Sequence, residues 1–144
     1  MKVKKYKIFV ESVNNIWYRG YTSKTKVLNY KWYSKEKSLA DTYADMNSII
    51  YGGDKIIDED IIDLSKYNLL DLSDYDMNNR YNENDIESIL EELNIEFDYT
   101  NLFDIIEEDI PLSRLINNIL EEILVEYDGL LVYENNIKTL CINN

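Results

Sequence analysis

The sequence predicts a single mixed α+β domain, and two observations lead to this prediction. Segments with the two-residue period of strands and segments of helical period follow one another in blocks: strands, one helix, strands, helices and two final strands. The chain has 144 residues, of which 45% are hydrophobic and 12% aromatic, enough for one sizeable core. Four Gly and one Pro give no segment the composition of a flexible linker, so residues 1–144 are expected to form one domain.

Three strands are predicted in the N-terminal part of the chain. Residues 2–12 alternate lysines with apolar side chains, residues 16–21 are β-branched and aromatic, and residues 29–33 form a second aromatic run. Residues 13–15 have the composition of a turn, and residues 22–28 form a polar, basic loop. These segments are expected to pair in one sheet.

A helix is predicted directly after the third strand. Ser34 is a suitable N-cap, because its hydroxyl can accept hydrogen bonds from amides two or three residues further on. The helix is expected to continue to about residue 48. Its buried face is predicted to carry Leu39, Tyr43 and Met46, which follow helical spacing.

The middle of the chain is predicted to return to strands. In residues 55–64, the acidic run 58–60 separates two isoleucine pairs, which suggests a strand, an acidic turn and another strand. Residues 69–73 form a further short strand, and residues 74–83 are polar and are predicted to be a loop.

Two helices are predicted in the second half of the chain. Asn84 and Asp85 can cap the first, and Asp109 as cap with Pro111 in the first turn marks the start of the second, which ends near Val125. Between them lies a short apolar piece at residues 102–106. The positions expected to face the core are Ile86, Ile89, Leu90, Leu93, Leu112, Leu115, Ile116, Ile119, Leu120 and Ile123.

A β-hairpin is predicted to close the chain. Its strands are residues 130–133 and 137–142, and Asn135-Asn136 has the composition of a tight turn between them. The helical segment before this hairpin, at about residues 74–126, is strongly acidic.

The charge of the chain is unevenly distributed. The net charge is −13, but residues 1–40 carry ten Lys or Arg and two Asp or Glu, a net charge of +8. Residues 41–144 carry the remaining −21. Two interpretations of this bipolar field remain open. The charge serves solubility alone, or the acidic region binds a basic partner or mimics nucleic acid.

Several kinds of site are excluded by composition. The chain has no His and a single Cys141, which removes internal disulfides, zinc sites of the usual Cys/His type and every catalytic scheme that depends on histidine. No glycine-rich phosphate-binding motif is present. The sequence has no apolar run long enough for a membrane span or a signal peptide, so a cytoplasmic protein is expected.

Three sequence blocks follow one another in a characteristic order. The first is the Tyr-Arg-Gly of residues 18–20, and the second is the Trp-Tyr-Ser of residues 32–34 with the helix around residues 40–44. The third is residues 127–132, an Asp-Gly turn followed by an apolar strand, with Ile137-Lys138 in the next strand. In this order and spacing the blocks resemble the ADP-ribosyltransferase fold, and more narrowly its small phage and polyvalent-protein members. The predicted strands and helix that contain the blocks make up roughly a third of the chain. The resemblance implies a split mixed sheet with flanking helices, into which the acidic helical segment is inserted.

The resemblance also implies a site for NAD. Arg19 would bind phosphate or ribose oxygens through its planar guanidinium. Tyr18 and Gly20 flank it, and Gly20 would let the ligand approach the backbone. Tyr33 or Tyr43 would stack on the nicotinamide ring.

Catalysis in this family needs a carboxylate beside the bond between nicotinamide and ribose, because the transition state resembles an oxocarbenium ion. Three residues near the C-terminus are candidates: Glu126, Asp128 and Glu134. Asp128 is the preferred candidate, because its turn begins a strand. Ser34 would hold the ribose or orient the acid. No metal is expected.

The function implied by the resemblance is a mono-ADP-ribosyltransferase that transfers ADP-ribose from NAD to a host protein. Such a phage protein would act in the host cytoplasm as an inhibitor of host defence, for example as an anti-CRISPR protein, and its target would present a basic surface. Neither a membrane nor a direct nucleic-acid partner is expected.

Two other hypotheses remain open from the sequence. One is a non-enzymatic inhibitor whose acidic region, residues 58–126, occupies the basic, nucleic-acid-binding surface of a host protein. The other is a transferase fold that binds NAD or another nucleotide without chemistry.

Overall fold

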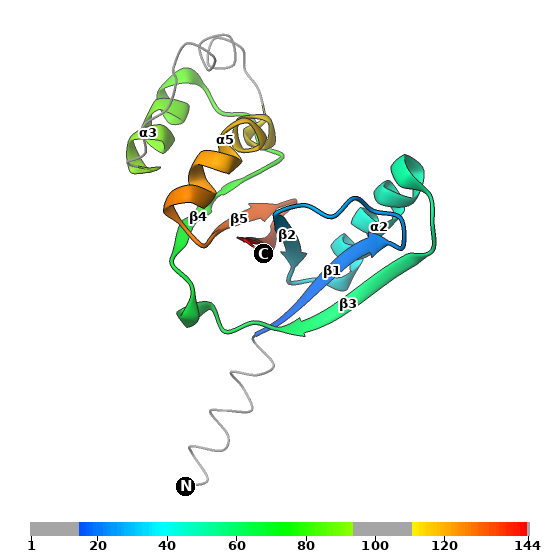
Figure 1. Cartoon of the computed structure of the whole chain (residues 1–144). Helices are drawn as coiled ribbons and strands as arrows, with labels where there is room; N and C mark the ends of the chain where they lie inside the picture. Colours follow the sequence, from blue (N-terminus) through cyan, green and yellow to red (C-terminus); the bar gives the residue numbers. More distant parts are fainter. Residues whose placement is uncertain (1–14, 94–110, 144) are drawn as a thin grey trace, which may run out of the picture.

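The computed structural model describes residues 15–93 and 111–143, which form a six-stranded mixed sheet and three α-helices (Figure 1). A single 3-10 turn, η1, follows β3. In chain order the elements are β1 (Ile16–Thr22), β2 (Tyr30–Ser34), α2 (Lys37–Tyr51), β3 (Lys55–Ile61), η1 (Leu64–Lys66), β4 (Leu69–Asp76), α3 (Glu83–Leu93), α5 (Leu112–Glu126), β5 (Gly129–Glu134) and β6 (Ile137–Asn143).

The sheet consists of two blocks that are joined by very little pairing. The strand order is β3-β1-β2-β6-β5-β4, and only β4 and β5 run parallel. β1 pairs with β3 along its whole length, from Ile16 to Thr22. Between β1 and β2, in contrast, Tyr18 and Ser34 form the one registered pair. The predicted α+β class is therefore confirmed. The six strands form one continuous sheet, and the β1–β2 seam is the place where neighbouring strands are paired least.

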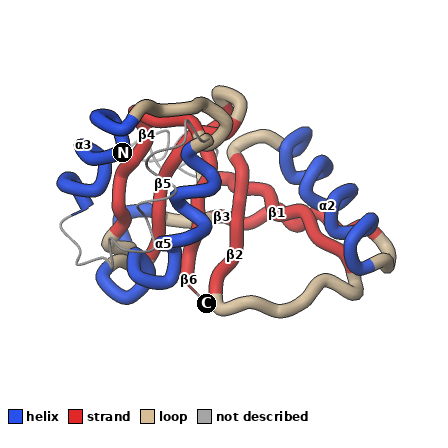
Figure 2. Tube along the Cα trace, turned by 90° about the horizontal axis from the view of Figure 1, so that it is seen from above, coloured by secondary structure: helices blue, strands red, loops and turns tan. Residues whose placement is uncertain are grey.

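All three described helices lie on the same face of the sheet (Figures 1 and 2). Residues directly opposite each other in neighbouring strands share a face, so Tyr18 and Ser34 lie on the face that also carries Gly20. A Cβ atom at Gly20 would stand 1.6 Å from the carbonyl oxygen of Ala40, which shows that α2 packs directly on β1 at this point. We call this the helix-covered face.

The main core lies between α3, α5 and the strands β4, β5 and β6. Leu72, Leu130 and Val132 supply the strand side of this core, and Cys141 is buried with them. The ten helical positions that the sequence assigned to the core are all buried, which confirms the predicted inward faces of both helices. Helical spacing is a reliable guide here because each helix covers the sheet with one continuous apolar stripe.

The opposite face of the sheet carries a second, smaller apolar cluster. Trp17 and Tyr33 are its largest members, Leu140 is fully buried with them, and Ile62 from the segment after β3 belongs to the same cluster. Strand alternation also places Arg19 on this face, two residues after Trp17. Neighbouring residues of β1 therefore point to different faces of the sheet.

The start of α2 differs from the prediction. Glu36, not Ser34, is the N-cap residue, and no side chain caps the helix. Ser34 is the last residue of β2, and its hydroxyl donates a hydrogen bond of 2.5 Å to the carbonyl oxygen of Glu36. The helix also runs on to Tyr51, and Met46 is 53% exposed, so its predicted burial is wrong.

The acidic run at residues 58–60 is not a turn. It belongs to the continuous strand β3, where Asp58 lies opposite Arg19 and Asp60 lies opposite Trp17. β4 is likewise longer than predicted and continues to Asp76. The predicted loop is thus confined to the residues between Asp76 and α3.

Pro111 precedes α5 instead of lying in its first turn. The first amides of the helix are satisfied by the chain before α3, because Leu112 donates to the carbonyl of Asn79 and Ser113 to that of Met77. The predicted C-terminal hairpin is confirmed, with positive φ angles at Asn135 and Asn136. The predictions for residues 2–12, residues 102–106 and Asp109 lie outside the described residues. None of the described helices combines the length and the apolar character needed to cross a membrane.

We predict that Gly20→Ala destabilises the protein by about 3 kcal/mol or more, because the added methyl group meets the backbone of Ala40 and must push α2 away. Urea unfolding followed by circular dichroism measures this loss. Gly52→Ala is the matched control: no atom lies within 4 Å of its Cβ position, and only the backbone conformation (φ 75°, ψ −165°), which is nearly restricted to glycine, opposes the substitution, at about 1–3 kcal/mol. Equal losses in the two variants would contradict the close packing of α2 on β1.

Candidate functional site

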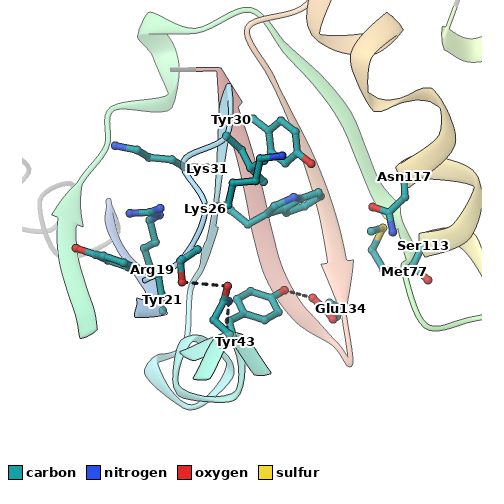
Figure 3. Close-up of a pocket in the computed structure, with 15 residues that line it drawn as sticks. Arg19, Tyr21, Lys26, Tyr30, Lys31, Tyr43, Met77, Ser113, Asn117 and Glu134 are labelled. Carbon is teal, nitrogen blue, oxygen red and sulfur yellow. Dashed lines mark hydrogen bonds between the residues drawn. The ribbon is translucent and has the colours of Figure 1, made fainter. Parts of the chain in front are cut away.

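A cleft of about 300 Å³ lies at the gap between β1 and β2 and is bordered by residues of α2 and α5 (Figure 3). Tyr43 and Glu134 reach it from the helix-covered face, whereas strand alternation directs Arg19, Tyr21 and Lys31 toward the opposite face. Figure 3 shows Arg19 and Tyr21 on one side of the cleft and Met77, Ser113 and Asn117 on the other. β1, β2 and the loop between them complete the lining.

The cleft exists because β1 and β2 separate after their single pair. Three consecutive residues of each strand line it, namely 19–21 of β1 and 30–32 of β2. Consecutive strand residues point to opposite faces, so the cleft must extend into the gap between the strands. Lys26 and Leu28, from the connecting loop, border the same space.

The charge of the lining is opposite to that of the whole protein. Arg19, Lys26 and Lys31 are its cationic residues, and Glu134 is its one acidic residue. The chain as a whole carries −13. A cluster of cations in a concave site of an acidic protein favours an anionic ligand, because the concave shape concentrates their field.

The aromatic content of the lining is also high. Tyr21, Tyr30, Trp32 and Tyr43 all contribute to it. Burial raises the pKa of Tyr30 above its usual 10.0, so its phenol, like the other tyrosine phenols at physiological pH, is neutral. Flat, neutral rings beside cations suit a ligand that has both ring systems and phosphate groups.

Glu134 is held in the cleft by a hydrogen bond from the hydroxyl of Tyr43. Burial of Tyr43 and this hydrogen bond raise the pKa of the phenol well above its usual range. Tyr43 therefore remains a donor, and its role is to orient the carboxylate as well as to line the cleft.

The backbone around Glu134 is fixed from the other side by Asp76. The buried carboxylate of Asp76 accepts hydrogen bonds from the amides of Asn135 and Asn136, at 3.2 and 2.8 Å. This contact holds the turn that directly follows Glu134. The carboxylate of Glu134 is thus positioned by a tight hairpin and by a helix.

Arg19 is stabilised by an aromatic neighbour on its own strand. Its guanidinium carbon lies 4.1 Å from the centroid of the Tyr21 ring. The Tyr21 hydroxyl in turn donates a 2.7 Å hydrogen bond to Asp58, which raises the pKa of Tyr21. The arginine is therefore held at the edge of the cleft in a defined orientation.

The loop that carries Lys26 is anchored to the end of α2. Thr25 donates a hydrogen bond of 3.1 Å from its hydroxyl to the side-chain oxygen of Asn47. Thr22 donates one of 2.7 Å to the carbonyl of Gly52. These contacts fix the cationic loop at the mouth of the cleft.

The residues predicted from the sequence are only partly brought together. Arg19, Gly20 and Tyr43 line the cleft. Tyr18 lies at the seam, opposite Ser34, and neither of them lines the cleft. Ser34 is fully buried and its hydroxyl is occupied by Glu36, so it is not available to hold a ribose.

Tyr33 belongs to a different surface. It is 8% exposed in the apolar cluster of the opposite face. A second cavity, of about 720 Å³, lies beside it. The charged residues of that cavity, Lys31 and Asp60, have opposite signs, so it lacks the cationic surplus of the cleft.

The three candidate acids lie at the two ends of β5. Asp128 is exposed and its carboxylate accepts a 2.7 Å hydrogen bond from the amide of Asn68, which fixes the turn before β5. Glu134 is at the other end of β5, about 20 Å away at ~3.4 Å per strand residue. Glu126 ends α5 near Asp128. Of the three, only Glu134 lines the cleft.

Sequence reasoning missed several residues of the cleft. Lys26 lies in the basic loop predicted at residues 22–28, and Lys31 lies in the strand that follows it. Neither lysine was predicted to belong to a site. Asn117 and Ser113 lie on the polar side of α5, and the helical period could have indicated that they share a face four residues apart. Their position opposite β1 depends on tertiary packing.

No protein-family model, no curated protein and no solved structure matches this chain. The resemblance to ADP-ribosyltransferases therefore stays a prediction.

We predict that Tyr43→Phe lowers the free energy of unfolding at neutral pH by about 1–2 kcal/mol, because Glu134 loses its partly buried donor. The substitution also changes how the free energy of unfolding depends on pH under alkaline conditions. The phenol of Tyr43 has its usual pKa of 10.0 in the unfolded chain and a higher pKa in the folded protein. Its contribution to the free energy of unfolding is therefore complete below pH 10 and is lost as the pH rises above that value.

Urea unfolding of wild type and Tyr43→Phe between pH 7 and pH 11 measures both effects. Wild type is expected to lose stability more steeply above pH 10 than the variant does. Tyr67→Phe, at a tyrosine that is 38% exposed, serves as the control and should keep the wild-type slope. The same alkaline slope in all three proteins would argue against a protonated, buried Tyr43.

Proposed function

We propose that the cleft binds NAD and that the protein is a mono-ADP-ribosyltransferase acting on a host protein. One observation carries the proposal: the cations Arg19, Lys26 and Lys31, four aromatic rings and the single carboxylate of Glu134 line the same cleft. NAD combines a pyrophosphate, two ring systems and a ribose bond whose cleavage develops positive charge. The lining has a suitable partner for each of these parts.

The cationic residues would hold the pyrophosphate. Arg19 can form two parallel hydrogen bonds to phosphate oxygens, and Lys26 and Lys31 add charge on the neighbouring loop and strand. A volume of about 300 Å³ is at the lower end of ligand sites, so the cleft would enclose part of the dinucleotide. Gly20 is buried beneath α2, so the space left by its missing side chain is taken by the helix backbone, and the predicted approach of a ligand at Gly20 does not apply.

Glu134 is the proposed catalytic residue. When the bond between nicotinamide and ribose breaks, nicotinamide leaves with the bonding electrons and the ribose becomes cationic. A carboxylate fixed before the reaction stabilises this charge without having to reorganise. The hydrogen bond from Tyr43 supplies this fixation, while an acceptor nucleophile on the target would attack the ribose carbon and lose its proton.

A second proposal remains the acidic inhibitor. On α3 and α5, every described acidic side chain is exposed, which leaves a negative surface available to a basic partner. These residues are Asp85, Glu87, Glu91, Glu121, Glu122 and Glu126. Binding of a basic host protein through this surface would weaken steeply between 50 and 200 mM salt. Binding that does not respond to salt would oppose it.

We predict that Glu134→Gln reduces nicotinamide release and ADP-ribose transfer by about 100-fold or more, because the amide cannot stabilise the developing positive charge. The substitution keeps the shape and leaves an acceptor for Tyr43, so NAD binding measured by calorimetry should change by less than about threefold. The assay uses labelled NAD, with host-cell lysate for transfer and without it for nicotinamide release.

Asp128→Asn is the matched control for this experiment. Asp128 is the acid that sequence reasoning preferred, but its carboxylate serves the turn at Asn68. Its substitution should leave transfer near the wild-type rate. Full activity in Glu134→Gln, or its loss only in Asp128→Asn, would refute the proposed role of Glu134.

A further inference from the structure

Large apolar side chains are exposed along one edge of the cleft. Of the nine exposed large apolar side chains in the described part of the chain, six lie in residues 27–28 and 46–51. Ile49 is 85% exposed and Ile50 67%, whereas Val27, which is 88% exposed, also lines the second cavity beside Tyr33. We call the surface formed by residues 24–28 and 46–51 the rim. A concentration of this kind marks an interaction site more often than scattered apolar residues do.

The two segments of the rim form one surface that borders the cleft. The hydrogen bond between Thr25 and Asn47 joins them directly. Leu28, from the first segment, and Asn47, from the second, both line the cleft. Anything bound on the rim therefore lies next to the proposed NAD site.

The charge of the rim itself is positive. Lys24 and Lys26 lie in its first segment, which has no acidic residue, and residues 46–51 carry no charge. Of the neighbouring acids, Asp41 and Asp45 form ion pairs with Lys55, and Asp54 lies beside Ser23. An apolar surface flanked by lysines is complementary to apolar side chains flanked by carboxylates. The same chemistry could suit an anionic membrane, but the net charge of −13 would repel one and thus favours a protein partner.

We infer that the rim docks the target protein through a segment that presents apolar side chains flanked by Asp or Glu. This inference rests on the proposed function, because it names the partner of the same site. It also reverses an expectation: the charge of the whole chain predicts a basic target, whereas the charge beside the cleft predicts an acidic one.

The test uses a designed, fluorescein-labelled amphipathic peptide with leucines at helical spacing and glutamates at the other positions, alongside a version with lysines in place of glutamates. Binding is measured by fluorescence anisotropy. The glutamate peptide is expected to bind wild type, and the lysine peptide is not. The rim variant Ile49→Asn with Ile50→Asn should lose about tenfold or more in affinity, since two apolar contacts are removed.

Val125→Asn is the matched control. Val125 is 82% exposed on α5, away from the rim, so this variant should bind the glutamate peptide like wild type. Equal binding of both peptides, equal affinity of the rim variant and wild type, or no binding of the glutamate peptide would overturn the inference. Binding of wild type to phosphatidylserine vesicles in place of the peptide would also overturn it.

The experiment separates this inference from the proposed function. Peptide binding is measured without NAD, and NAD binding of the rim variant is measured by calorimetry without peptide. If wild type binds NAD but the glutamate peptide does not bind at the rim, only the docking surface is refuted. Absence of NAD binding in wild type refutes the proposed function, even where the peptide binds.

Discussion

The hydrogen bond from Tyr43 to Glu134 links two blocks of the structure that the sheet itself scarcely joins. One block is β1, β3 and α2, and the other contains β2, β6, β5 and β4 with α3 and α5 (Figure 2). At the seam the backbone contributes one registered pair, Tyr18 with Ser34. Lys35 supports the closed end of the seam, because its ammonium donates to the carbonyl of Ile16 at 3.2 Å. The partly buried hydrogen bond at Tyr43 and the contacts of Lys35 therefore fix how far the two blocks separate.

The cleft follows from this arrangement. If β1 and β2 paired along their full length, residues 19–21 and 30–32 would share ladder hydrogen bonds and leave no space between them. Gly20 is needed on the other side, since its missing side chain lets the backbone of α2 approach β1. A wide seam and a close helix together place Arg19, Tyr43 and Glu134 around one space. The same strand separation extends the loop with Lys26 over the mouth of the cleft.

The features that were predicted correctly depend on interactions between residues close together in the sequence. The apolar stripes of α3 and α5 and the Asn135-Asn136 turn were predicted from residue spacing and turn chemistry, and the structure confirms them. Asp58 and Asp60 were misassigned to a turn, because their acidity is tolerated in an edge strand where Asp58 faces Arg19 and Tyr21. Ser34 was misassigned as a cap, because its hydroxyl found a partner in the carbonyl of Glu36 rather than in an amide. The sequence also left Asp128 and Glu134 undecided, since only the packing of α2 against the end of β5 distinguishes them.

A nucleotide site between β1 and β2 is tested most simply by titrating the isotope-labelled protein with NAD and following its amide resonances by NMR. Shifts are expected to be concentrated at residues 19–21, at residues 25–32 and around Glu134, while the exposed helix surface of α3 stays unchanged. Shifts confined to α3 and β4, or no shifts at about 1 mM NAD, would contradict a nucleotide site between β1 and β2.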